Sequence, residues 1–398
     1  MNPQMLNKSI STKSTIQKPV FKNILLEKWD EREQRLIKTE IVITITKDNQ
    51  IMYFSNGRLL RIESIQEDFK VQQIFTNIEQ VKHFQWQGEF EQNNKKIGKW
   101  IAKWNGKVLQ DVGGYYSNGL KYGLWKEPIQ NYWNKAQVFE VGQYINGQKR
   151  GVWMYIYNKK KLNGGQYNEQ GQKNGKWRDL SDGFHEKSQV IYDGEYINGQ
   201  KVGKWDIYFQ DHYENKPKLI GGGLYNETGQ GYKNGRWIEL SHEFRRTSQI
   251  TFDGQYINDK KVGRWDIYWN QYGNNYKIGG GSYDQSGNEV KINGWIELRE
   301  GFTEESKITY HGEYQNGKQI GRWDVLYRGK KIGGGLYDQS GDGCKTGNWI
   351  ESSDLFKGSS QVTYRGQYKN GKKVGKWVKI TETSFSQQIK QNEILYDY

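Results

Sequence analysis

The side chains best suited to catalysis or metal binding are scattered along this chain rather than grouped. The five histidines fall in separate stretches and lack the short spacings typical of zinc ligands. Serine, histidine and carboxylate residues form no motif that predicts a nucleophile with its base. We therefore expect no metal site, no catalytic residue and no enzyme. The histidines are His83, His185, His212, His242 and His311.

Two glycine-containing stretches match ligand-binding loops only in part. Gly221–Gly223 leads into an expected strand, so it lacks the helix N-terminus that a phosphate-binding loop requires. Residues 338–343 (DQSGDG) match the opening of a calcium loop, but Trp349 occupies the position of the bidentate glutamate. We interpret this stretch as an ordinary turn, and the sequence predicts no cofactor.

The chain is organised instead around a β-hairpin motif, which is clearest in residues 192–209, YDGEYINGQKVGKWDIYF. Two alternating runs flank Asn198-Gly199, the pair that best tolerates the positive φ angles of a tight hairpin turn. Side chains alternate between faces with a period of two, which puts large rings beside Gly194. We predict that a cross-strand aromatic ring lies over the backbone that this glycine exposes.

This motif recurs from about residue 88 to about residue 380. Six units of type A follow the outline Y-x-G-E-Y-x-N-G-x-K-x-G-x-W, and five units of type B, GG-Y-G-G-W in outline, alternate with them. Hydrophobic residues make up only 34% of the chain, with 48 glycines and 16 tryptophans, which suits a thin repeat array. Type A units span 88–100, 142–153, 194–205, 254–265, 312–323 and 366–377; type B units span 113–125, 164–177, 221–237, 279–295 and 333–349.

The recurring tyrosine, glycines, Asn-Gly turn and tryptophan resemble the MORN repeat family. The resemblance is closer to its tryptophan-closed variant, as in bacterial antitoxin-like MORN proteins, since most MORN units end in Gly-x-Gly where this chain has Gly-x-Trp. It implies an all-β fold, an elongated single-layer β-meander or solenoid of about eleven hairpins. It also implies a scaffold or a lipid- or protein-binding surface, without a catalytic residue.

The two long edges of such a sheet should differ chemically. Turns within units would lie on one edge, where basic residues would recur about every 10 Å. Because the formal net charge is +14, we predict that this turn edge binds an acidic membrane surface or acidic protein tails. The alternative is that the charge only keeps a thin protein soluble. The predicted turn-edge cations are Lys149, Arg150, Lys173, Lys201, Lys233, Lys260, Lys261, Lys318, Lys345, Lys372 and Lys373.

The other edge carries the connections between units, with an aromatic residue seven positions after each type B tryptophan. We favour the interpretation that these rings close the end of the sheet beneath each connection, since a repeated exposed ring would be costly. The alternative is a ridge that contacts partners. The residues are Tyr132, Phe184, Phe244, Phe302 and Phe356.

The flanks of the array differ from the repeats. An amphipathic pattern predicts a helix over 24–38, and the runs 41–46 and 51–54 predict strands. We interpret these elements as a small α+β cap, because a repeat array needs its terminal hydrophobic face covered. Near the C-terminus, residues 394–396 could add an edge strand to an otherwise polar tail. The predicted domains are a disordered tail (1–23), the cap (24–86), the MORN-like array (87–380) and a C-terminal tail (381–398).

The sequence contains no transmembrane segment, because its longest apolar run, 41–45, is far too short to span a bilayer. Cys344 is the only cysteine, which favours a cytoplasmic location. A mitochondrial presequence at the basic N-terminus is disfavoured by its lack of arginine. The richness in Asn, Gln and Lys resembles repeat families of ciliated protists, which suggests association with the cytoskeleton or a cilium.

We expect a non-catalytic scaffold that binds other proteins or attaches to an anionic membrane or cytoskeletal surface. The alternative is an aromatic solenoid that holds choline or a carbohydrate between its rings. Nucleic acid is a disfavoured partner, because no recognised nucleic-acid-binding module is visible.

Overall fold

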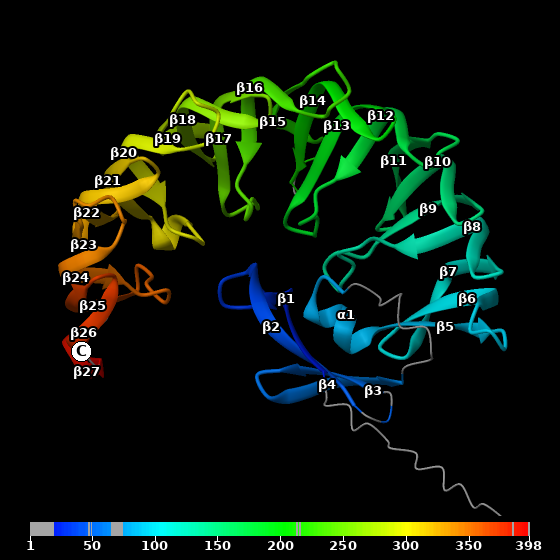
Figure 1. Ribbon diagram of the computed structural model, residues 1–398, viewed down its shortest axis with the longest axis horizontal. Helices are drawn as coiled ribbons and strands as arrows, with labels where there is room; N and C mark the ends of the chain where they lie inside the picture. The colour runs from blue at the N-terminus through cyan, green and yellow to red at the C-terminus, as the bar shows by residue number, and fades with distance from the viewer. Residues whose placement is uncertain are drawn as a thin grey trace, which may run out of the picture.

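The computed structural model describes residues 20–46, 48, 50–64, 75–211, 214, 216–383 and 386–396. Its elements are almost all β-strands, joined as antiparallel hairpins in sequence order. Figure 1 shows a small N-terminal sheet enclosed by an arc that the remaining strands form. Most of the predicted disordered tail lies outside the described residues, and strand β1 begins within its last residues, at Val20.

The N-terminal sheet has four strands in the order β1-β2-β3-β4. Its core consists of alternate apolar residues, including Ile41 and Ile43 of β2 and Ile51 of β3, on which Val81 of the short helix α1 packs. No helix among the described residues is long and apolar enough to cross a membrane. The elements are β1 (Val20–Asp30), β2 (Arg35–Ile45), β3 (Gln50–Ser55), β4 (Arg58–Ser64) and α1 (Ile78–His83).

The helix predicted over 24–38 is wrong, because these residues form most of the β1–β2 hairpin. The Asp30 carboxylate accepts hydrogen bonds from the backbone N–H groups of Arg32 and Glu33, both at 2.8 Å, which stabilises the turn. Leu26 is buried whereas Leu25 is 67% exposed, the alternation of a strand. The strand predicted at 41–46 is present as the end of β2, which stops at Ile45, and the strand predicted at 51–54 lies within β3.

Strands β5 to β27 form one long antiparallel meander, and each pairs with the next strand in sequence. Type A and type B units each contribute one hairpin to it, which confirms the expected all-β repeat architecture. The strands are β5 (Phe84–Phe90), β6 (Lys96–Trp104), β7 (Lys107–Ser117), β8 (Leu120–Pro128), β9 (Val138–Ile145), β10 (Gln148–Tyr157), β11 (Lys160–Tyr167), β12 (Lys173–Leu180), β13 (Gln189–Ile197), β14 (Gln200–Gln210), β15 (Lys218–Tyr225), β16 (Lys233–Leu240), β17 (Gln249–Ile257), β18 (Lys260–Gln271), β19 (Asn274–Tyr283), β20 (Lys291–Leu298), β21 (Ile308–Gln315), β22 (Lys318–Tyr327), β23 (Lys330–Tyr337), β24 (Lys345–Ser352), β25 (Ser360–Lys369), β26 (Lys372–Thr383) and β27 (Ser386–Tyr396).

The hairpin turn that the sequence predicts most firmly is confirmed. Asn198 and Gly199 have φ angles of 48° and 84°, and they join β13 to β14 with Ile197 opposite Gln200. Positive φ at both central positions is the requirement of a type I′ turn, whose twist matches that of the flanking strands. The turn therefore fixes the register in which the two strands of the unit pair.

The C-terminal tail predicted at 381–398 is wrong for most of its length, and its alternative, an edge strand, is present. β27 pairs with β26 and places Ile394 opposite Trp377. The ring of Tyr396 lies 6.2 Å from that of Trp377, so the last strand completes the packing of the preceding one. Within the described residues no pairing joins β27 to β5, and the meander is open (Figure 1).

Candidate interaction surfaces

One face of the meander carries a continuous column of alternating tryptophan and tyrosine rings from Trp100 to Tyr396. Successive ring centroids lie 5.0 to 6.4 Å apart, and all of these pairs are edge to face. The tryptophans of this column are at most 6% exposed. We call this side of the sheet the tryptophan face. Its rings are core, because every unit adds one tryptophan to the same stack and every unit after the first adds one tyrosine.

Each tryptophan of the column lies directly over a glycine, as the sequence predicts. A Cβ atom added to Gly194 would lie 2.3 Å from the ring of Trp205, and one added to Gly254 would lie 2.2 Å from the ring of Trp265. The Trp205 indole N–H also donates a hydrogen bond to the Glu195 carbonyl oxygen at 3.2 Å. The glycine is therefore required because the ring fills the space of its side chain.

Most of the predicted turn-edge cations do not form a free row. Seven of the lysines fold back onto the tryptophan face, where their ammonium groups lie 4.1 to 4.8 Å from indole ring centroids. They reach the rings because the lysine at the start of a strand points to the same face as the tryptophan that follows it. These seven are Lys149, Lys173, Lys201, Lys233, Lys261, Lys345 and Lys373.

Carboxylates that the sequence analysis missed neutralise many of these lysines. Glu239 forms ion pairs with Lys233 and, at 2.9 Å, with Lys261, and it accepts a hydrogen bond from the Tyr256 hydroxyl at 2.8 Å. Burial raises the pKa of Glu239, but the two lysines outweigh it and the pKa lies below its usual value. The signal in the sequence is a carboxylate two residues after each type B tryptophan. These residues are Glu127, Asp179, Glu239, Glu297 and Glu351.

Four predicted cations remain near the turns. Arg150 donates hydrogen bonds to the Asn168 carbonyl oxygen at 2.8 Å and to the Gln148 side chain at 2.7 Å. Lys260 lies 3.8 Å from the Glu289 carboxylate. Lys318 and Lys372 are exposed and form no ion pair with any described residue. The positive charge available on the turn edge is thus much smaller than the sequence implies.

The five aromatic residues on the connection edge are buried, with exposed fractions of 1 to 6%. Phe184 packs edge to face on Tyr157 at 5.3 Å, and Phe244 packs on Phe209 in the same way at 5.3 Å. Tyr132 similarly lies 5.1 Å from Trp104. These rings, with Phe302 and Phe356, close the end of each hairpin and offer no exposed ring face to a partner.

The N-terminal hairpin occupies much of the connection edge. The Trp29 ring lies 5.4 Å from the ring of Trp133 and 5.6 Å from that of His185. The Arg35 guanidinium forms ion pairs with Glu243 and, at 3.2 Å, with Glu300. The sheet that the sequence analysis interprets as a cap thus contacts connections from several units along the arc (Figure 1).

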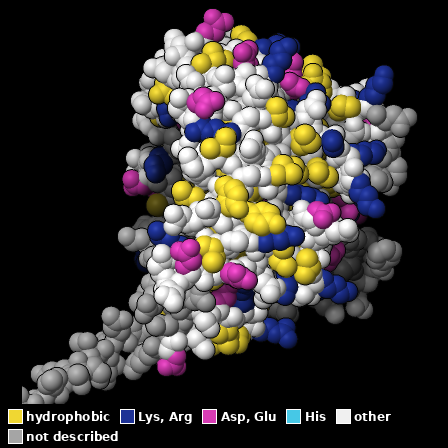
Figure 2. Space-filling view, turned by 90° about the vertical axis from the view of Figure 1, so that its right-hand side faces the viewer, with side chains coloured by type: hydrophobic (Ala, Val, Ile, Leu, Met, Phe, Trp, Pro, Cys, Tyr) yellow, Lys and Arg dark blue, Asp and Glu magenta, His cyan; other side chains and the backbone are white. Residues whose placement is uncertain are grey.

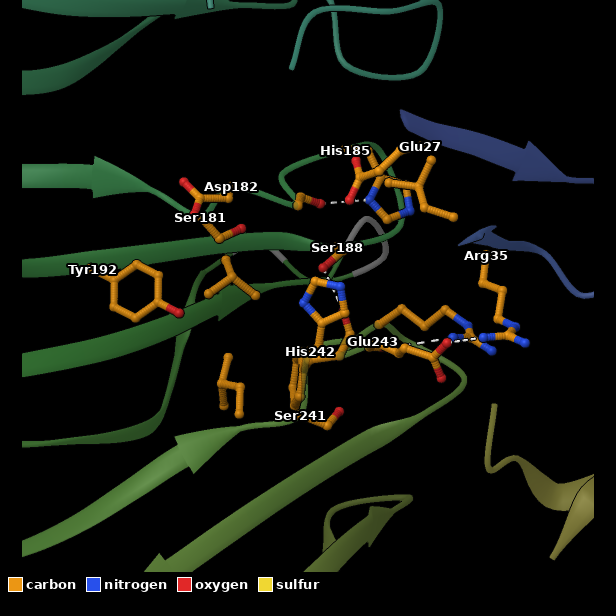
Figure 3. Close-up of a pocket in the computed structure, with 16 residues that line it drawn as sticks. Glu27, Arg35, Ser181, Asp182, His185, Ser188, Tyr192, Ser241, His242 and Glu243 are labelled. Carbon is orange, nitrogen blue, oxygen red and sulfur yellow. Dashed lines mark hydrogen bonds and ion pairs between the residues drawn. The ribbon is translucent and has the colours of Figure 1, made fainter. Parts of the chain in front are cut away.

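A cavity of about 240 Å³ lies where this hairpin meets the connections (Figure 3). It brings together two of the scattered histidines, His185 and His242, with Ser181, Ser188 and other polar residues. The His185 Nδ1 atom bonds the Gly183 carbonyl oxygen at 2.9 Å, and burial lowers the pKa of this imidazole. Ser188 donates its hydroxyl hydrogen to the Phe244 carbonyl oxygen at 2.6 Å. The Ser181 and Ser241 hydroxyls and the His185 Nε2 atom are buried here without a hydrogen-bond partner among the described residues.

Comparison with known proteins identifies no family for this chain. No protein-family model matches the chain. No curated protein matches it significantly either.

Proposed function

We propose that this protein is a non-catalytic scaffold of the MORN type, which holds other proteins or attaches to an anionic membrane or cytoskeletal surface. The observation that carries the proposal is the uninterrupted aromatic column. It commits the repeated tryptophans, tyrosines, glycines and many lysines to holding hairpins together. The remaining exposed side chains are then displayed at a regular spacing along a long sheet, which is the arrangement that a scaffold needs.

The alternative prediction, a solenoid that binds choline or a carbohydrate, has less support. Such a site needs accessible ring faces, whereas the tryptophans of the column are at most 6% exposed and lie beneath lysine ammonium groups. A cytoplasmic location with cytoskeletal or ciliary association is part of the proposal, and tagging the protein in its native cell tests it.

Anionic attachment is tested with two triple variants that remove equal charge. Lys260, Lys318 and Lys372 are exposed at the turns, so their replacement by glutamine should weaken binding to phosphatidylserine vesicles without lowering the Tm. The matched control replaces the half-buried Lys233, Lys261 and Lys373, which should lower the Tm because their carboxylate partners lose their counterions.

Vesicle binding by the wild-type protein should also fall steeply with salt. Undiminished vesicle binding by the exposed-lysine variant would remove the turn edge from the proposal. A wild-type protein that binds neither vesicles nor any protein would contradict the scaffold itself.

A further inference from the structure

The face of the meander opposite the tryptophan face carries paired charges along most of its length. In each unit the residue before and the residue after the tryptophan point to this opposite face, because neighbours in a strand alternate. Three type A units, those that contain β14, β18 and β22, have Lys or Arg just before the tryptophan and Asp just after it. In each of them these two side chains form an ion pair. The pairs are Lys204–Asp206 at 3.0 Å, Arg264–Asp266 at 2.7 Å and Arg322–Asp324 at 2.9 Å.

Strand β10, in a type A unit, departs from this pattern, and strand β8 of the preceding type B unit carries no charge pair on this face either. Leu124 and Val152 occupy the positions of the cations, and they are 72% and 57% exposed. Met154 occupies the position of the carboxylate in β10, and Lys126 follows the tryptophan in β8. The substitutions leave the tryptophan column intact, since Trp125 is as buried as its counterparts. The departure therefore affects the exposed surface and serves no purpose in the core.

The exposed leucine and valine belong to a larger apolar area. The rings of Tyr115 and Tyr122 face each other across β7 and β8 with their centroids 6.1 Å apart. Leu120 and Ile145 flank the neighbouring turns, and all four residues are 45 to 50% exposed. Figure 2 shows this side of the molecule, where hydrophobic side chains gather among Lys and Arg and some Asp and Glu. We define the apolar patch as Tyr115, Leu120, Tyr122, Leu124, Ile145 and Val152.

Lysines are the only charged residues in the two rows of positions that run through the apolar patch. Lys99 lies opposite Tyr115, and Lys126 lies opposite Val141. Neither lysine forms an ion pair with any residue that the structure describes, although the Lys126 ammonium lies 4.9 Å from the Phe139 ring centroid. From β6 to β10 the two rows of positions that hold charge pairs elsewhere contain no carboxylate. They hold Lys99, Ile101, Gly113, Tyr115, Leu124, Lys126, Val141, Gln143, Val152 and Met154.

We propose that the apolar patch binds an acidic amphipathic segment of a partner protein. The segment would bury apolar side chains against Leu124 and Val152 and place carboxylates near Lys99 and Lys126. The inference rests on the proposed scaffold function and names a site and a partner class for it. Four strands at ~4.8 Å spacing make the patch about 15 Å wide, which matches a single helix of ~10 Å diameter better than a globular domain.

Charge disfavours a second copy of this chain as the occupant. In a two-fold symmetric dimer the same patch would face itself. Lys99 and Lys126 of both copies would then be brought together in a desolvated contact, which like charges disfavour. An acidic segment supplies the missing carboxylates, as Asp206, Asp266 and Asp324 do within the chain elsewhere.

The test uses the full-length protein and two synthetic helical peptides of about 18 residues. Both peptides carry the same leucine face, but the polar face is glutamate in one and lysine in the other. Fluorescence anisotropy should show that the acidic peptide binds and that the basic peptide does not. The double variant Leu124→Lys/Val152→Lys should lose at least about tenfold in affinity for the acidic peptide. It should fold, because lysine occupies the equivalent position at Lys204.

Leu224→Lys is the matched control, since Leu224 is another exposed leucine on a distant strand, and its peptide affinity should equal that of the wild type. A second variant, Lys99→Gln/Lys126→Gln, should bind the acidic peptide more weakly, and its binding should depend less on salt concentration. Equal binding of both peptides, or full binding by the Leu124/Val152 variant, would overturn the proposal. Self-association or phosphatidylserine binding that this variant abolishes, without peptide binding, would assign the patch to another occupant.

Binding to vesicles through Lys260, Lys318 and Lys372 uses a different edge of the sheet. Loss of peptide binding without loss of vesicle binding, or the reverse, therefore distinguishes failure of this inference from failure of the proposed anionic attachment.

Discussion

Replacing Gly194 by alanine should destabilise the protein, although the same change in an unobstructed strand is expected to stabilise it. The new Cβ would lie 2.3 Å from Trp205 Cδ2 and 2.4 Å from its Cε2. Carbon atoms pack at no less than about 3.5 Å, so the indole would have to move by about 1.2 Å. Alanine is the informative substitution because a single methyl group already produces the conflict.

The magnitude follows from what that shift disturbs. It loosens the Trp205 N–H bond to the Glu195 carbonyl oxygen, 3.2 Å long, and the contacts with Tyr196 at 5.1 Å and Tyr225 at 6.1 Å. A net hydrogen bond is worth about 0.5–1.5 kcal/mol, and an aromatic pair about as much. Partial loss of these contacts with the strain of overpacking gives an expected loss of about 2–4 kcal/mol.

Gly294 in β20 provides the matched control. Its added Cβ meets no atom within 4 Å and its φ is not positive, so Gly294→Ala should be neutral or stabilise by up to about 1 kcal/mol. Urea unfolding followed by circular dichroism measures both variants. Hydrogen exchange at β13 and β14 checks that the loss is local. Equal stability of the two variants would refute the packing of glycine beneath tryptophan.

Three further predictions concern the core. Glu239→Gln should cost about 1–3 kcal/mol, since Lys233 and Lys261 lose a shared counterion, and chemical denaturation measures it. Because the pKa of folded Glu239 lies below its usual value of 4.5, its stabilisation is present above about pH 4.5 and lost as pH falls through the folded pKa. When Tm is measured as a function of pH, the values for the wild type and for Glu239→Gln should therefore become equal in acid. Burial raises the pKa of Tyr116 to about 12, so Tyr116→Phe should leave the phenolate absorbance gained between pH 9 and 11 unchanged. Phe244→Ala should cost about 3–5 kcal/mol by opening a cavity, and Tm reports the loss.

Local signals in the repeat predict the fold well. The Asn198-Gly199 turn and the ring over Gly194 follow from backbone geometry and side-chain alternation, which depend only on near neighbours. The same reasoning failed over 24–38. Leu25, Trp29 and Leu36 have helical spacing, but packing of Leu26 with Ile41 and Ile43 in a sheet decides the outcome. Tertiary contacts of this kind are not visible in a local pattern.

The candidate surfaces were harder to predict because they depend on which strands pair. Lys261 lies in a type A unit on β18 and its partner Glu239 lies on β16, just after the preceding type B unit, so their ion pair exists only in the folded register. Counting charges along the chain therefore overstated the basic edge. The apolar patch was missed for a related reason, since Leu124 and Val152 look like ordinary core residues until their face is known.

The N-terminal hairpin should also affect how the array unfolds and how strongly it is curved. A linear repeat array melts from its ends, because each unit depends only on its neighbours. Here Glu33 forms an ion pair with Lys357 at 3.3 Å, and Arg35 forms ion pairs with Glu243 and, at 3.2 Å, with Glu300. The N-terminal hairpin therefore links units that lie far apart along the arc. Fraying of the last strands back to β25 would break the Lys357 link and loosen the bend of that end of the arc. Curvature and cooperativity are therefore coupled in this molecule, and both are set by a hairpin that belongs to none of the repeats.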